Sequence, residues 1–451
     1  MANINFRLDD YQADLASGLC SPPEALCPNY VVDPVLYHRH ANSGQRRDRL
    51  DEALRQVHLR TGDQYFRETY PLQARTLDYS ARAFPAYRFI LPEVMSEDWL
   101  AIVDWGKFQR DHVLHQPLCG YIVLKLLDGG SGSPLHLPDG TTLLDSCVSH
   151  ILQWKATSYI RDFLIECGMS VDDPLLDASS CVARNVWRCF FREAAYIAAV
   201  FHDLGYPWQY AERLQSNLFG MNSPSITTNR SATQVFDEYE HRLLMHALRG
   251  YKKQDAASPS RWASEIVQLT DVALSQTHGF PGALGFLHLN DAIRKYPIRE
   301  QSPLHLLCVE WVAVAIMMHD LGKIYWGKDR LGGESPTNPS LRLSFDRDPL
   351  SSIVTLADVL QEFNRPTAKF GQTNGIGLND QVVISYESVC SETELELDGA
   401  AMTIRYKMKD DDSRRIKRKS IADDQHCYFD RASGFLNMES IGIESVKLEA
   451  V

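Results

Sequence analysis

Apolar residues recur at spacings of three and four from Trp99 to about Phe370, in long segments separated by loops rich in Gly, Pro and Ser. This spacing is typical of helices that bury one face. We therefore expect an all-helical core in the central part of the chain. The pattern predicts helices over residues 106–127, 142–167, 184–203, 232–250, 261–276, 281–294, 303–320 and 349–364.

Beyond Gln372 the pattern changes to alternating apolar and polar residues, as in DQVVISYESV, ELELDG and AMTIRYKM. Such alternation predicts short β-strands. The chain begins with an irregular stretch that carries Pro and Cys, followed by a charged amphipathic helix near residues 43–60. We expect a mainly α protein in three parts: an N-terminal extension over 1–100, a helical domain over 101–370 and a small β-rich (α+β) domain over 373–451.

Composition narrows the class of protein. Among the 451 residues no apolar run reaches the roughly 20 residues of a membrane helix, and the polar start MANINFRLDDYQ does not resemble a signal peptide. The scattered cysteines form no CxxC pairs, which predicts reduced thiols rather than a disulfide framework. We therefore expect a cytoplasmic protein with no membrane partner.

The net charge of −12 argues against broad nucleic-acid binding through phosphate neutralisation. One basic patch, SRRIKRKS (Ser413 to Ser420), directly follows the acidic KDDD. Mixed charge of this kind predicts a solvated loop.

Two apolar segments end in the same tetrapeptide, His-Asp-Leu-Gly: YIAAVFHDLGYP and WVAVAIMMHDLGK. Burying an unpaired imidazole or carboxylate there would cost roughly 1–3 kcal/mol per group. A metal ion would remove that cost, since it binds both groups. A single His-Asp pair can instead close a helix by hydrogen bonding, but two copies favour the metal. Gly205 and Gly322 are predicted to end the two helices in left-handed caps.

Other histidines and one carboxylate extend this pattern. FQRDHVLHQPL supplies His112 and His115, SHILQW supplies His150, THGFPG supplies His278, and SIVTLADVLQ supplies Asp358. A helix-borne His, a His-Asp doublet, further histidines and a final Asp resemble the HD-domain metal-dependent phosphohydrolase superfamily. The resemblance covers roughly residues 105 to 366 and implies an HD-like helical bundle.

The resemblance implies a metal-binding set in the order His, His-Asp, His, His, Asp. His115 is the preferred first ligand, with His112 and His150 as alternatives. A rival assignment takes His278, His319 with Asp320, and Asp358 as a complete mononuclear set, in which case the first doublet is a remnant or a second site. Together the implied ligands are His115, His202, Asp203, His278, His319, Asp320 and Asp358.

The resemblance also implies chemistry. Asp203 is suited to bridging two ions, and Lys323 and Arg365 are candidates for contacting a phosphate. A His-rich set with carboxylates suits one or two Mn, Fe, Co, Ni or Zn ions better than Mg. The expected activity is therefore hydrolysis of a phosphoester in a nucleotide or related small molecule.

Two other functions are kept open. The same ligand set suits a di-iron oxygenase of the inositol-oxygenase kind. It also suits a sensor that binds a nucleotide or metal and contacts a protein partner through its C-terminal domain.

Overall fold

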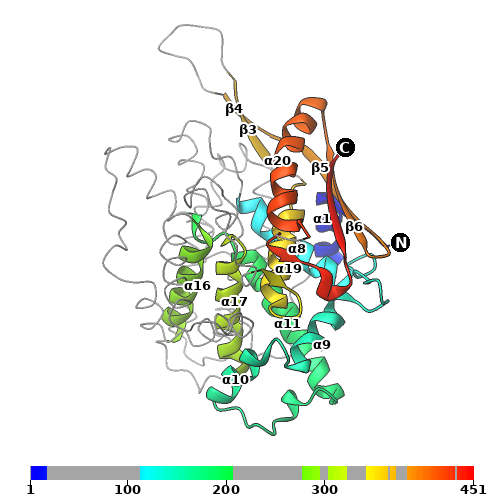
Figure 1. Ribbon diagram of the computed structural model, residues 1–451. Helices are drawn as coiled ribbons and strands as arrows, with labels where there is room; N and C mark the ends of the chain where they lie inside the picture. Colours follow the sequence, from blue (N-terminus) through cyan, green and yellow to red (C-terminus); the bar gives the residue numbers. More distant parts are fainter. Residues whose placement is uncertain are drawn as a thin grey trace, which may run out of the picture.

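A computed structural model describes residues 2–17, 112–206, 277–294, 303–321, 342–363, 366–371, 383–431 and 434–451 (Figure 1). The helices predicted near 43–60, 232–250 and 261–276 lie outside these ranges. Within them, a bundle of helices lies beside a small mixed β-sheet, which confirms a mainly α protein with a small β part.

The bundle is built around α11, which packs against α8, α9, α17 and α19, while α16 packs against α17. From Ala194 to Phe201 every residue of α11 is buried, because neighbours surround the end of this helix. The helices are α8 (His112–Asp128), α9 (Leu143–Gln153), α10 (Ser158–Glu166), α11 (Cys181–Phe201), α16 (Gly279–Arg294), α17 (Pro303–Met318) and α19 (Pro349–Leu360), with a short 3-10 turn, η1 (Pro174–Leu176).

Local capping fixes where two of these helices begin. The Ser180 side chain accepts a hydrogen bond from the Ala183 amide at the start of α11. At the start of α19, Asp348 caps the Ser351 amide, and Pro349 occupies the first turn, where its missing N–H costs nothing. These caps help to set which residues lie at the opposite ends of the helices.

The single helix predicted over 142–167 was wrong, because the structure contains two helices there. Trp154 adopts a left-handed conformation (φ 52°) that ends α9. The Thr157 hydroxyl then lies 3.0 Å from the main-chain oxygens of both His150 and Ile151. Apolar spacing continues through this break and therefore could not reveal it.

Four strands form the main sheet in the order β1-β5-β6-β8. β1 (Ala2–Phe6) pairs antiparallel with β5 (Cys390–Asp398), β5 pairs antiparallel with β6 (Ala401–Met408), and β6 runs parallel to β8 (Ser445–Ala450). Ile4, Leu395, Ile404 and Leu448 pair in register across all four strands, and each is buried. The alternating pattern therefore places one face of the sheet in the core.

Smaller pairs complete the β structure. β2 (Leu343–Ser344) runs parallel to β7 (Leu436–Asn437), and β3 (Pro366–Gly371) pairs antiparallel with β4 (Val383–Ser388). A 3-10 turn, η3 (Glu439–Ile441), precedes β8.

Two local expectations for the ends of the chain were wrong. Residues 2–6, predicted to be irregular, form β1 at the edge of the sheet and lead into α1 (Leu8–Ser17). The patch predicted as a loop lies within a helix, α20 (Asp411–Phe429), which packs against β8 and β6. Asp410 caps this helix, and Arg414 and Arg415 pair with acidic residues one turn earlier.

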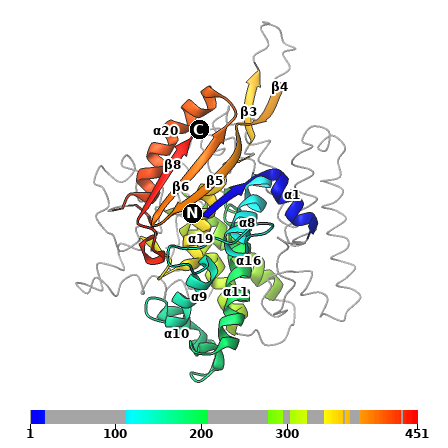
Figure 2. The same ribbon diagram turned by 90° about the vertical axis from the view of Figure 1, so that its right-hand side faces the viewer.

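The sheet packs directly on the helical bundle (Figure 2). One cluster of buried apolar side chains contains residues from both parts. The Tyr406 hydroxyl on β6 donates to the main-chain oxygen of Val359 on α19 (2.8 Å), and Lys417 on α20 pairs with Glu362 just after α19 (3.1 Å). The sheet and α20 therefore support the end of α19. The domain boundary near residue 370 stays a prediction.

The helices in the described ranges include none whose length and apolar character would suit a bilayer crossing.

Candidate metal centre

Six histidine and aspartate side chains from five helix ends converge inside the bundle. His115 lies in the first turn of α8, and Asp358 lies in the last turn of α19. The remaining four lie just outside their helices: His202 and Asp203 after α11, His278 before α16, and His319 after α17. All six side chains are at most 11 % exposed.

One half of the cluster contains His115, His202 and Asp358. The Nε2 atoms of the two histidines lie 3.1 Å apart. Asp358 Oδ1 lies 3.0 Å from His115 Nε2 and 3.7 Å from His202 Nε2. These three side chains therefore direct their ligand atoms at one point.

The other half contains His278 and His319, whose Nε2 atoms are also 3.1 Å apart. Asp203 joins the halves: its Oδ1 lies 2.8 Å from His278 Nε2 and 3.3 Å from His202 Nε2, and its Oδ2 lies 3.3 Å from His115 Nε2. Both His-Asp doublets thus contribute to one cluster.

Each of the four imidazoles has its Nδ1 atom directed at an oxygen on the side away from the cluster. His202 Nδ1 lies 2.7 Å from the Ala199 carbonyl oxygen, and His319 Nδ1 lies 2.6 Å from that of Ile316. A carbonyl oxygen can only accept, so both Nδ1 atoms donate their protons. In a neutral imidazole this leaves a lone pair on Nε2, directed into the cluster.

Gln361 fixes His115 in the same way. Its Nε2 donates to the Phe363 carbonyl oxygen (3.0 Å), which leaves Oε1 to accept from His115 Nδ1 (2.5 Å). His278 Nδ1 lies 2.8 Å from Asp320 Oδ2. All four Nε2 atoms therefore lie on the side of the rings that faces Asp203 and Asp358.

This arrangement fits a metal ion. Lone pairs and carboxylate oxygens about 3 Å apart repel one another unless protons or a metal ion lie among them. Metal–nitrogen bonds of about 2.0–2.1 Å place two imidazole nitrogens about 2.9 Å apart at a right angle and about 3.3 Å apart at a tetrahedral angle. The observed separations of 3.1 Å lie within this range. The cluster is a buried group of residues that could hold a metal ion.

The pKa shifts of the cluster histidines in the metal-free protein also show how strongly the site attracts positive charge. Burial opposes the charged form of His278, but Asp320 and Asp203 outweigh it and raise its pKa to about 9. For His202, burial is likewise outweighed by Asp203 and Asp358, so its pKa rises. Burial lowers the pKa of His319, and the neighbouring histidines add to that effect. The cluster therefore attracts positive charge overall but does not favour protonation at every imidazole.

Cys119 lies beside the first half, one turn after His115 on α8, and its sulfur is close enough to be counted with the ligand atoms. Its Sγ atom is 3.7 Å from His115 Nδ1 and 3.8 Å from Nε2. A sulfur almost equally distant from both ring nitrogens does not lie along the Nε2 lone pair. We interpret Cys119 as part of the wall around His115.

Several sequence-predicted residues lie elsewhere. His150 is on α9 and belongs to neither group of potential ligands found in the described ranges. His112 begins α8, but its side chain is not described. Lys323 and Arg365 lie outside the described residues. Cys119 was missed at the sequence level, although its i+4 spacing from His115 was a usable signal.

The backbone conformation of Gly205 differs from the predicted left-handed cap. Gly205 is absent from the described glycines that have positive φ, so it does not form a left-handed cap. Instead, a Cβ atom on Gly205 would overlap the main-chain oxygen of His278. The residue is small because α16 begins against the end of α11. Gly322 lies outside the described residues.

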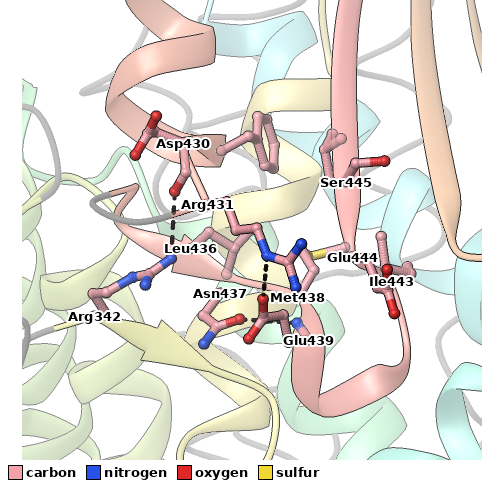
Figure 3. A pocket seen from close by; sticks show the side chains of 12 residues that line it. Arg342, Asp430, Arg431, Leu436, Asn437, Met438, Glu439, Ile443, Glu444 and Ser445 are labelled. Carbon is pink, nitrogen blue, oxygen red and sulfur yellow. Dashed lines mark hydrogen bonds and ion pairs between the residues drawn. The ribbon is translucent and has the colours of Figure 1, made fainter.

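A small pocket lies away from this cluster, between the end of α20 and the start of β8 (Figure 3). Its volume of about 20 Å³ has room for about one water. Arg342 donates to the Gly434 and Asp430 carbonyl oxygens, and Arg431 pairs with Glu439. These contacts connect neighbouring segments, and we assign no ligand to the pocket.

Comparison of the chain with protein-family models, with curated proteins and with solved structures found no match.

Replacing Gln361 with Leu is expected to weaken metal binding by about 10–100-fold, the effect typical of removing a hydrogen-bond partner from a ligand histidine. The physical reason is that His115 Nδ1 would lose its acceptor and its fixed orientation. Equilibrium dialysis with Zn²⁺ would measure the change. Cys119→Ala is the control, because it removes a side chain beside the same ring and should leave metal affinity within about threefold. Equal affinities for wild type and Gln361→Leu would contradict the prediction.

Proposed function

We propose that the chain is a metal-dependent phosphohydrolase of the HD type, which cleaves a phosphoester in a nucleotide or related small molecule. The observation that carries this proposal is the convergence of four histidine Nε2 atoms on Asp203 and Asp358, with an oxygen acceptor at Nδ1 of His202, His319 and His115. Their order along the chain is His, His-Asp, His, His, Asp, as the resemblance to HD proteins implies.

The residues present suit this chemistry. His115, His202 and Asp358 would hold one ion, His278 and His319 a second, and Asp203 would bridge them. Bound ions of this kind generate a hydroxide nucleophile near neutral pH and neutralise charge on a phosphoryl group. The imidazole-rich set favours Mn, Fe, Co, Ni or Zn over Mg.

The chain's own groups have distinct roles in this proposal. The buried apolar ends of α11 and α17 exclude bulk water from the ligands, which strengthens every charge interaction in the cluster. Asp203 and Asp358 hold negative charge beside the imidazoles. Lys323 and Arg365 are proposed to bind the phosphate oxygens of the substrate. The acidic net charge argues for a small phosphorylated substrate over nucleic acid.

A di-iron oxygenase is the second candidate, because four histidines and two carboxylates also suit two iron ions. A sensor that binds a nucleotide or a metal without turnover is the third. Its support is the contact of Tyr406 with Val359 at the end of α19, which carries Asp358, and of Lys417 with Glu362 just after that helix.

Elemental analysis of the purified full chain, combined with a phosphate-release screen, tests the proposal. We expect at least one bound transition-metal ion per chain and phosphate release from at least one compound in a panel of nucleoside triphosphates, cyclic nucleotides and alarmones. Chelation should abolish turnover, and Mn²⁺ should restore it. Iron content with oxygen consumption and no hydrolysis would favour the oxygenase instead. Nucleotide binding without turnover would favour the sensor.

A further inference from the structure

The two His-Asp doublets use their carboxylates in different ways, although their sequences are identical. Asp203 directs Oδ1 at Nε2 of His278, on the side of the ring that faces the cluster (2.8 Å). Asp320 directs Oδ2 at Nδ1 of the same ring, on the opposite side (2.8 Å). The Asp320 oxygen also accepts a hydrogen bond from the His278 main-chain N–H (3.2 Å).

His278 is consequently held at its backbone, at both ring nitrogens and on one face of its ring. Asp320 holds both its backbone and its Nδ1 atom. Tyr206, which follows the first doublet, stacks on the imidazole with ring centroids 3.9 Å apart and planes 17° apart. The ring has little freedom to rotate, and its Nε2 atom is directed at Asp203 and at His319 Nε2.

The close packing that allows this arrangement depends on two glycines. A Cβ atom on Gly279 would lie 2.7 Å from the Ile316 carbonyl oxygen and 3.0 Å from that of Met317. Gly205 makes a still closer approach to the main chain of His278. Both doublets can therefore reach the short segment that carries His278.

The groups that contact Nδ1 of the four imidazoles differ in charge. Nδ1 of His202 and His319 faces a carbonyl oxygen, and Nδ1 of His115 faces the amide oxygen of Gln361. Only Nδ1 of His278, among these four, faces a carboxylate in the described structure. A carboxylate in this place makes the imidazole a stronger ligand and fixes its tautomer.

The half of the cluster that contains His278 also has fewer ligand carboxylates. Asp203 is shared by both halves, whereas Asp358 lies beside His115 and His202. The Asp320 carboxylate lies beside His278 Nδ1 and therefore adds negative charge next to the half that has no carboxylate of its own.

We propose that Asp320 is a positioning residue that sets the affinity for an ion held by His278 and His319, and is not itself a ligand. This inference rests on the proposed metal-dependent function. It separates the roles of the two doublets: Asp203 binds metal directly, and Asp320 acts through His278.

Metal titration of the chelator-treated full chain tests this assignment. Mn²⁺ and Zn²⁺ would be titrated separately into wild type, Asp320→Asn and Asp320→Ala, with bound metal counted by equilibrium dialysis. We expect two ions per wild-type chain. In Asp320→Asn one of the two ions should lose about 10–100-fold in affinity, while the other stays within about threefold. Asp320→Ala should lose more, because Asn retains an oxygen that can accept from Nδ1.

Electron paramagnetic resonance of the Mn²⁺ samples gives a readout independent of activity. Two ions sharing Asp203 should produce an exchange-coupled spectrum in wild type, and Asp320→Asn at the same Mn²⁺ concentration should give the spectrum of a single ion. Asp348→Asn is the matched control, because Asp348 is a buried carboxylate that caps α19 and bonds Trp311. It should lower stability without changing the metal count.

The outcomes separate this inference from the proposed function. Two ions in wild type with unchanged affinities in both Asp320 variants would overturn the role of Asp320 and leave the metal centre intact. One ion in wild type would also overturn it. Loss of both ions in Asp320→Asn would mean that Asp320 is a ligand or is needed for the whole cluster. If wild type binds neither metal, the metal-dependent function itself fails.

Discussion

Replacing Asp203 with Asn is expected to abolish binding of both metal ions, with a loss on the order of 10³-fold or more. That loss exceeds the roughly 10–100-fold loss of metal affinity expected when a residue that hydrogen-bonds a ligand histidine is replaced. The reason is that Asp203 lies in both halves of the cluster. Its oxygens lie within 3.7 Å of the Nε2 atoms of all four histidines. Asn supplies no charge and only one oxygen, so it cannot bridge two ions. Elemental analysis of the purified variant would measure the loss.

His150→Ala is the control for this experiment. His150 was an alternative first ligand in the sequence, and it lies on α9 outside both ligand groups in the described ranges. Its removal should leave the metal content unchanged. A metal content near the wild-type value in Asp203→Asn would show that the cluster does not bind metal through this carboxylate.

Replacing Glu193 with Gln is expected to stabilise the protein at alkaline pH. Glu193 lies in α11 with 5 % of its surface exposed, and its Oε1 accepts no hydrogen bond in the described structure. Burial raises its pKa from 4.5 to about 8, opposed only in part by Arg192. Ionisation in the folded protein therefore leaves a carboxylate in the apolar interior.

The sign of the pH dependence follows from the raised pKa. Below pH 4.5 the carboxyl group is protonated in both folded and unfolded chains, so the wild type is most stable relative to the variant there. Between pH 4.5 and about 8 the unfolded chain ionises more readily, and the wild type loses stability. At about 1.4 kcal/mol per pKa unit, the advantage of Glu193→Gln should grow by roughly 3–5 kcal/mol across this range.

Urea unfolding of wild type and Glu193→Gln at pH 5 and pH 9 would measure this difference. Glu444→Gln, at an exposed glutamate, is the control and should unfold like the wild type at both pH values. A stability difference that does not change with pH would contradict the assignment of the raised pKa to Glu193.

The sequence predicted much of the helical bundle, because burial of one helix face leaves a period that can be read directly. The helices expected over 303–320 and 349–364 start where α17 and α19 start. The predicted C-terminal ends were less accurate. In α19 the helix ends before Gln361, whose side-chain amide donates to the Phe363 carbonyl oxygen. Such an end depends on side-chain contacts, not on apolar spacing.

The ends of the chain were harder to predict for a different reason. β1 is short, and its pairing partner in β5 lies nearly 400 residues later, so nothing nearby in the sequence marks it as a strand. α20 has low apolar content, and its mixed charge resembles that of a solvated loop. Its packing against β8 and β6, together with the Asp410 cap, stabilises the helix.

By itself, the sequence determined which residue types lie at the ends of the apolar helices. Two identical His-Asp doublets can be recognised in the sequence, and burying imidazoles and carboxylates without a partner is unfavourable, so they indicate a site. The tertiary structure alone decided which atoms meet. It brought His115 to His202 across 87 positions and joined both doublets at His278. It also gave Asp203 and Asp320 opposite sides of one imidazole ring, a difference set by where α16 begins and by two glycines, and therefore absent from the tetrapeptide that the two doublets share.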